Sequence, residues 1–177
     1  MKWKKIFQFI DLIKLIYWKK TLGKLGPGSR IFNNVVIKNP KNLYMETKSY
    51  IYDECFLAIG KNSKIIIGSN SHLGVRVYCN CSDCNLYIGN DVAIGLYTQI
   101  YTYSNSYEIG KIYHNCYKIA DVYIGNNVFI GAGVIILPGV KIGDNSVIGA
   151  GSIVNKNIPA NVLAYGQPIS IIKELKK

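Results

Sequence analysis

Histidine is scarce in this chain, and its positions limit the proton-transfer chemistry that the sequence can support. The chain contains only His72 and His114. An imidazole changes charge near neutral pH and is the side chain most often used as a general base. His114 lies in a tyrosine-rich polar segment and is the stronger candidate for that role. His72 immediately precedes Leu73, at a position expected to face outwards, so we interpret it as a surface histidine or one lining a groove.

Other polar side chains of the same segment offer different chemistry. Tyr103 and Glu108 could accept a proton, although a tyrosine with a pKa near 10 is a poor base at neutral pH. Asn105 cannot accept a proton, but its amide can orient a hydroxyl group or donate to an oxyanion.

Three of the five cysteines follow a C-x-C-x-x-C spacing at Cys79, Cys81 and Cys84. Such a cluster could supply thiolates to zinc, but no fourth ligand lies nearby in the sequence. Cysteine is also a common small buried residue, so no metal site is predicted. An odd number of cysteines without a secretory signal predicts reduced thiols in the cytoplasm.

The scaffold that must position these residues has a six-residue period. A branched aliphatic residue recurs at Ile124, Ile130, Ile136, Ile142, Ile148 and Val154. This period fits neither a helix nor strand alternation and is typical of a parallel β-helix. Three hexads form one triangular coil of about eighteen residues, and coils stack roughly 4.8 Å apart. We therefore predict an all-β fold with a β-helix over residues 29–160 and the aliphatic residues inside.

The period fails between Tyr101 and Tyr123 and resumes at Ile124. An excursion over about 101–123 is predicted to be a surface loop, and long loops in compact folds tend to be functional. After the β-helix, residues 161–177 are predicted to form a short basic tail or helix.

Positive charge is concentrated at the N-terminus. The formal net charge is +11, and the first thirty residues hold eight basic side chains against one acidic one. The repeat body is therefore only mildly basic, and nucleic-acid binding is not expected as the main function.

Residues 1–28 are predicted to form a basic amphipathic helix and a linker. Apolar side chains follow helical spacing at Trp3, Ile6, Phe7, Ile10, Ile13 and Tyr17. One interpretation is that the helix caps the first coil. The other is that residues 2–20 lie on an anionic membrane surface. The segment is too short to span a membrane.

The C-terminal third carries a set of specific motifs: two I-G-A-G hexads (130–133 and 148–151), an L-P-G-V turn (137–140), the segment V-N-K-N-I-P (154–159) and a terminal G-Q-P (166–168). With these motifs the chain resembles the hexapeptide-repeat acetyltransferases. Its N-terminal pattern looks like the branch that O-acetylates sugars for surface polysaccharides.

The resemblance implies a left-handed β-helix, a homotrimer and active sites in grooves between neighbouring prisms. Acetyl-CoA would be the acetyl donor, and a sugar or glycan would be the acceptor. The residues implied to bind the pantetheine through backbone amides are Ala132, Gly133, Ala150 and Gly151. Lys156 would lie near the nucleotide phosphates, and Pro168 and Lys173 near the adenosine.

One element of the family pattern is missing. In the family, a histidine after the strand matching Ile100 deprotonates the acceptor hydroxyl, whose oxygen then attacks the thioester. The matching segment here, residues 102–106, reads T-Y-S-N-S. We expect His114 to supply the imidazole from a shifted position, with Tyr103 and Asn105 as the other catalytic candidates.

The sequence thus predicts an acetyl-CoA-dependent O-acetyltransferase that acts on a hydroxyl of a sugar or polysaccharide precursor. Its predicted location is the cytoplasm, with peripheral contact to the inner face of the membrane. Two alternatives stay open: a trimeric β-helix that binds a partner without catalysis, and a sugar N-acetyltransferase.

Overall fold

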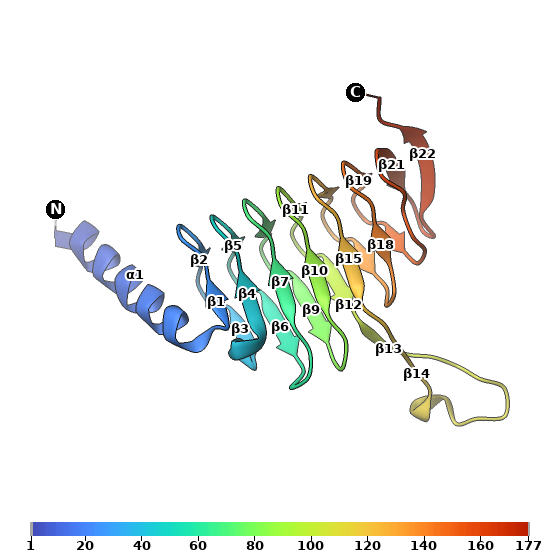
Figure 1. The fold of residues 1–177 in the computed structure, drawn as a ribbon, viewed down its shortest axis with the longest axis horizontal. Helices are drawn as coiled ribbons and strands as arrows, with labels where there is room; N and C mark the ends of the chain where they lie inside the picture. The colour runs from blue at the N-terminus through green and yellow to red at the C-terminus, as the bar shows by residue number, and fades with distance from the viewer. Residues whose placement is uncertain (1, 177) are drawn as a thin grey trace.

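The computed structural model describes the backbone of residues 2–176 and the side chains from residue 12 to residue 176. The chain winds into a three-sided prism whose faces are parallel sheets, which we call A, B and C (Figure 1). Sheet A contains β1 (Lys24–Leu25), β4 (Leu43–Met45), β7 (Ile65–Ile67), β10 (Leu86–Ile88), β15 (Val122–Ile124) and β18 (Lys141–Ile142). Sheet B contains β2 (Arg30–Ile31), β5 (Tyr50–Ile51), β8 (His72–Leu73), β11 (Ala93–Ile94), β16 (Phe129–Ile130), β19 (Val147–Ile148), β21 (Val162–Tyr165) and β22 (Ser170–Glu174). Sheet C contains β3 (Val36–Lys38), β6 (Phe56–Ile59), β9 (Tyr78–Cys81), β12 (Gln99–Tyr101), β17 (Ile135–Ile136) and β20 (Ile153–Val154).

The hexad aliphatics form the core, as predicted. Ile130 pairs in register with Ile94 below it and with Ile148 above it, and all three are fully buried. Each such side chain contributes about 1.5–3 kcal/mol on burial, and branched shapes pack well on their copies in adjacent coils. This stacking confirms the predicted left-handed β-helix.

The corners between sheets A and B are stabilised by a ladder of asparagines. Asn127, Asn145 and Asn161 have left-handed backbone conformations, with φ of 52°, 57° and 59°. Asn127 Nδ2 donates to Asn145 Oδ1 at 2.9 Å, and Asn145 Nδ2 donates to Asn161 Oδ1 at 3.0 Å. Asparagine tolerates positive φ better than bulkier residues do, so the sequence suits these turns.

Helix α1 (Lys2–Thr21) extends away from the first coil (Figure 1). Its end is anchored, because Trp18 packs on the core and Leu22 is 8% exposed. Toward the N-terminus of the helix, four apolar side chains are between 47% and 55% exposed: Leu12, Ile13, Ile16 and Tyr17. The other apolar side chains at helical spacing lie before residue 12, outside the part of the chain whose side chains the structure describes: Trp3, Ile6, Phe7 and Ile10. No helix in the described part of the chain is long and apolar enough to cross a membrane.

The C-terminal segment differs from the prediction of a tail or helix. Residues Ser170–Glu174 form strand β22, which pairs antiparallel with β21 at the last coil. The edge of β21 offers unpaired backbone groups, and the β-branched pair Ile171 and Ile172 favours an extended conformation. Tertiary pairing therefore decides the structure of this short segment.

The excursion is confirmed as a surface feature, and it is more regular than a loop. Strands β13 (Tyr103–Asn105) and β14 (Tyr117–Ile119) pair antiparallel, with Tyr103 opposite Ile119. A short 3₁₀ helix, η2 (Tyr113–Asn115), lies near the tip, and another, η1 (Pro40–Asn42), precedes β4. The hairpin projects from the prism (Figure 1), so its side chains are available to contact a neighbouring molecule.

Candidate functional site

The two I-G-A-G motifs lie at the corner between sheets B and C. On successive coils, the third residue after the buried strand residue has a left-handed φ, from 59° to 70°; these residues, which we call the site corner, are Glu54, Arg76, Tyr97, Gly133 and Gly151. They form one column because the strands of sheet B pair in register without a shift at each step. Consecutive members are therefore roughly 4.8 Å apart along the prism.

Backbone amides along this corner alternate between bonded and free. Gly133 N donates to Leu96 O at 2.8 Å, and Gly151 N donates to Ala132 O at 2.8 Å. The N–H groups of Ala132 and Ala150 donate to no other group among the described residues. Of the four amides expected to bind ligand, those of the two glycines hold the coils together, and those of the two alanines remain available.

The upper part of the site corner is bare. A side chain at Gly133 would meet no other atom within 4 Å, and at Gly151 it would meet only the Gln167 amide, at 3.9 Å. The surface beside the free amides of Ala132 and Ala150 is therefore open at the two glycines. This arrangement offers two donors, one coil apart, to an extended ligand that carries carbonyl groups.

The C-terminal segment borders the upper end of the site corner. Gln167 Nε2 donates to Gly151 O and fixes the chain just before Pro168. Lys156 follows strand β20, and Lys173 lies opposite Leu163 in β22. Both lysines and Pro168 are exposed. Lys156 lies at the corner between sheets C and A, whereas Lys173 lies on sheet B, whose last strand leads to the site corner.

The three predicted catalytic residues lie together on the hairpin. Asn105 Nδ2 donates to the backbone oxygen of His114 at 3.4 Å. The ring of Tyr103 stacks on Tyr117, with centroids 5.1 Å apart. Partial burial, together with a hydrogen bond to Tyr117, raises the pKa of Tyr103 and makes it a still poorer base. Glu108 forms a 2.6 Å ion pair with Lys111, while the His114 side chain is exposed.

The hairpin and the site corner do not converge within one chain. The hairpin follows β12 of sheet C and precedes β15 of sheet A, so it leaves the prism at the corner between sheets C and A. The site corner lies at the opposite edge of sheet C, and the hairpin points away from the prism (Figure 1). A single chain therefore presents the two halves of the predicted site on separate edges.

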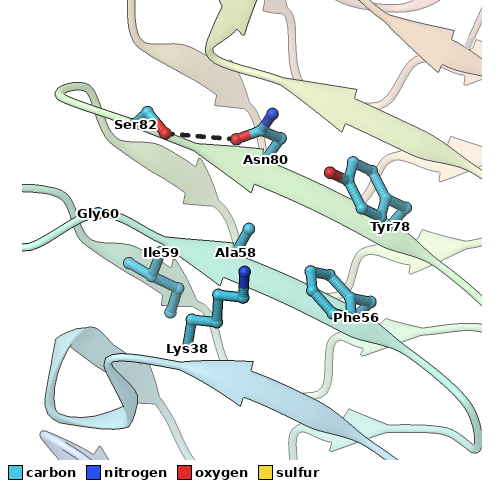
Figure 2. A pocket seen from close by; sticks show the side chains of 8 residues that line it. All are labelled: Lys38, Phe56, Ala58, Ile59, Gly60, Tyr78, Asn80 and Ser82. Carbon is cyan, nitrogen blue, oxygen red and sulfur yellow. Dashed lines mark hydrogen bonds between the residues drawn. The ribbon is translucent and has the colours of Figure 1, made fainter.

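A cleft of about 650 Å³ lies on the outer face of sheet C, between these two edges. Figure 2 shows its lining residues: Lys38, Phe56, Ala58, Ile59, Gly60, Tyr78, Asn80 and Ser82. The rings of Phe56 and Tyr78 stack 5.6 Å apart, and Tyr101 continues the row at 5.8 Å from Tyr78. Lys38 Nζ lies 5.5 Å from the Phe56 ring centre. No sequence motif indicates this cleft, because its residues are about 20 positions apart and meet only through the strand register.

The cysteines and His72, which could also react, lie in environments that suit a structural role. Burial raises the pKa of Cys55 to about 11 and that of Cys81 to about 12, so both are protonated, inert thiols. His72 packs edge-on against Tyr52 at 5.7 Å, and partial burial lowers its pKa. Across residues 12–176, no three His, Cys, Asp or Glu side chains gather as a metal site would require.

Known proteins share the repeat sequence of this chain. Residues 121–156 match the family model described as bacterial transferase hexapeptide (six repeats). The galactoside O-acetyltransferase of Lactococcus lactis is 35% identical over 156 residues, which cover 81% of this chain and 73% of that protein. The galactoside O-acetyltransferase of Escherichia coli is 39% identical over 145 residues, covering 74% and 70%.

A solved structure shows the same fold. A mutant of AntD, an N-acyltransferase from Bacillus cereus, in complex with dTDP and coenzyme A, superposes with a TM-score of 0.82 at 25% identity. The match covers 89% of this chain and 87% of that one. The repeat motifs, the stacked parallel sheets and these relatives together show that the chain belongs to the hexapeptide-repeat acetyltransferase family.

Proposed function

We propose that this protein transfers an acetyl group from acetyl-CoA to a hydroxyl of a sugar or glycan precursor. The observation that carries the proposal is the pair of free amides at Ala132 and Ala150, each beside a glycine that faces open space, within the motifs shared with the family. The two galactoside O-acetyltransferase relatives support the sugar hydroxyl as acceptor.

Acetyl-CoA fits along the upper site corner. The carbonyl groups of the pantetheine arm accept hydrogen bonds from Ala132 N and Ala150 N. The phosphates lie toward the exposed cation Lys173, which favours negative charge, and the adenosine lies against Pro168. Lys156, at the corner between sheets C and A, contributes its charge from a neighbouring copy. The thioester then lies at the lower end of the bare stretch, where Tyr97 occupies the corner position one coil below Gly133.

A neighbouring copy completes the site in a homotrimer. The hairpin of one chain projects from its own prism, and the site corner of the same chain lies at the other edge of sheet C. If prisms pack side by side around a threefold axis, the hairpin of one copy can reach the site corner of the next. His114 of the neighbouring copy then lies beside the thioester.

The cleft on sheet C is the acceptor site in this proposal. Its aromatic row, Phe56 and Tyr78, offers flat apolar surface to a sugar ring. Asn80 and Ser82 offer amide and hydroxyl groups to sugar hydroxyls, as polar groups in ligand pockets commonly do.

The reaction is a direct transfer. His114 removes the proton from the acceptor hydroxyl while the oxygen attacks the thioester carbon. A carbon–oxygen bond forms, the tetrahedral intermediate collapses, the carbon–sulfur bond breaks, and the protonated imidazole returns its proton to the CoA thiolate. Asn105 positions the hairpin backbone at His114 through its hydrogen bond.

Release of free CoA thiol, measured with Ellman's reagent and a panel of acceptor sugars, tests the proposal. Transfer by the wild type and its loss in His114→Ala are expected, whereas the matched variant His72→Ala should keep wild-type rates. No transfer to any acceptor, combined with no CoA binding in calorimetry, would leave the binding-protein alternative. Wild-type rates in His114→Ala would instead exclude His114 as the base.

Transfer to an amine is a second candidate. Two observations favour it: the close superposition on an N-acyltransferase and the absence of histidine from residues 102–106. A neutral amine is a stronger nucleophile than a hydroxyl and needs less help from a base. Comparing a 4-amino-4-deoxy sugar with its 4-hydroxy counterpart decides between the two, because an O-acetyltransferase should prefer the hydroxyl substrate.

The N-terminal helix suits peripheral contact with the inner face of the cytoplasmic membrane. Beside its exposed apolar side chains, a groove of about 870 Å³ between α1 and the first coil includes Lys14, Lys19 and Arg30 in its lining. Apolar surface flanked by cations binds anionic bilayers. Sedimentation with vesicles containing anionic lipid should require residues 1–23, and unfolding of the truncated form would instead assign the helix a capping role.

A further inference from the structure

We infer that Tyr97 is a catalytic hydrogen-bond donor that stabilises the thioester oxyanion, and that Arg76 and Glu54 position its hydroxyl. This inference rests on the proposed function and adds to it a residue that neither the family motifs nor the repeat pattern indicate. Tyr97 lies where the bare upper part of the site corner meets the part that carries side chains.

The placement of Tyr97 follows from strand register. Ile94 pairs with Ile130, so Tyr97 and Gly133 occupy the same corner position on consecutive coils of the prism. Gly133 N donates to the oxygen of Leu96, directly before Tyr97, at 2.8 Å. The Tyr97 Cα is therefore about 5 Å from the glycine beside the free Ala132 amide. A ligand bound on that amide passes within reach of the phenol.

The Tyr97 hydroxyl is held by a network that runs along the corner. Arg76 Nη1 donates to Tyr97 Oη at 2.5 Å, and Arg76 Nε donates to Glu54 Oε2 at 2.5 Å. The guanidinium also lies 5.5 Å from the centre of the Tyr97 ring. These contacts fix the phenol orientation while 48% of the residue remains exposed. The hydroxyl is thus both ordered and accessible.

The backbone at these positions is unusual for large side chains. Tyr97 and Arg76 both have φ of 59°, a region that is uncommon for residues other than glycine, asparagine and aspartate. The coils above use glycine at the same position, and the asparagine ladder occupies the A–B corner. Lys48 has φ of 53° at the A–B corner, so the turns of the prism accommodate large side chains elsewhere as well. What distinguishes Tyr97 and Arg76 is the contact between them beside the free Ala132 amide.

The proposed role of Tyr97 follows from the hydrogen bonds that its hydroxyl can make. A phenol can accept one hydrogen bond and donate another. Because Arg76 already donates to the phenol oxygen, the O–H of Tyr97 is left to donate outward, and the neighbouring cation strengthens that donation. As the acceptor oxygen bonds to the thioester carbon, negative charge develops on the carbonyl oxygen, which accepts a hydrogen bond from Tyr97 O–H. Tyr97 keeps its proton when the carbon–sulfur bond breaks.

Tyr97→Phe removes only this hydroxyl and tests the inference. We expect kcat to fall about 10²-fold or more. The Kd for CoA, measured by calorimetry, should stay within about twofold of wild type. The matched control is Tyr87→Phe, since Tyr87 stacks on Tyr123 on sheet A, away from the site corner. A positioning role for Arg76 predicts that Arg76→Gln lowers kcat in the wild type but adds little in the Tyr97→Phe background.

The outcomes separate the two proposals. An active wild type with a fully active Tyr97→Phe variant overturns the role of Tyr97 and leaves the proposed function intact. A wild type that transfers acetyl to no acceptor overturns the proposed function and this role with it. A Tyr97→Phe variant that loses CoA binding to the same extent as activity shows a structural role and also overturns the inference.

Discussion

Replacing Ala132 by proline would remove one backbone N–H from the site corner and little else. That N–H donates to no other group among the described residues, so no bond between coils is lost. The chain itself shows that proline fits: Pro138 precedes Gly139, with φ of 85°, as Ala132 precedes Gly133, with φ of 66°. The equivalent corner between sheets C and A therefore already accommodates the fixed φ of proline.

The size of the effect follows from the bond that is lost. A neutral hydrogen bond contributes a net 0.5–1.5 kcal/mol, which corresponds to a roughly 2- to 12-fold rise in the Kd for CoA. Because this N–H binds the pantetheine arm and not the reacting carbonyl, kcat at saturating acetyl-CoA should change little. The free energy of unfolding should change by less than about 1 kcal/mol, because the coils keep all their mutual hydrogen bonds.

Calorimetry with CoA, the thiol-release assay and urea unfolding measure these three quantities separately. Pro138→Ala is the matched control, since it exchanges the same residue types and leaves the Ala132 N–H in place. An unchanged Kd for CoA in a folded Ala132→Pro variant would refute the assignment of this amide to the cofactor. A large loss of stability would show that the corner cannot accept proline and would refute the equivalence of the two corners.

Three further predictions address the scaffold and its ionisable groups. Ile130→Ala should lower the free energy of unfolding by about 2–5 kcal/mol, because Ile130 is fully buried. Phe129 is 53% exposed, so Phe129→Ala should lower it by less than about 1 kcal/mol. Urea unfolding measures both changes. Ellman's reagent should modify Cys84 and Cys116 in the folded protein and all five thiols after unfolding, since the other three are buried; rapid reaction of more than two would contradict this. Burial raises the pKa of Asp121, but hydrogen bonds to its carboxylate outweigh burial and hold the pKa below the ordinary 3.8. Its stabilisation is therefore present above pH 3.8 and lost as the pH falls through the lowered pKa, so Asp121→Asn should be less stable than wild type at pH 6, with a difference that shrinks below pH 3.8.

Local sequence was sufficient where one residue type repeats in one environment. The hexad aliphatics predicted the prism, because a side chain such as Ile130 has the same buried neighbours in every coil. The interruption after Tyr101 predicted the excursion for the same reason. The C-terminal strand was not predictable in this way, since Ser170–Glu174 is extended only because the edge of β21 is available to pair with it.

The sequence by itself determined the β-helix, the family and the I-G-A-G motifs that resemble its cofactor site. These depend on short-range periodicity, which a linear pattern records directly. Only the tertiary structure decided which amides are free at that corner, because their hydrogen bonds join coils about 18 residues or more apart. It also brought Arg76 to Tyr97 and placed the hairpin on a different edge from the site corner, since strand register sets contacts between residues that no local pattern connects.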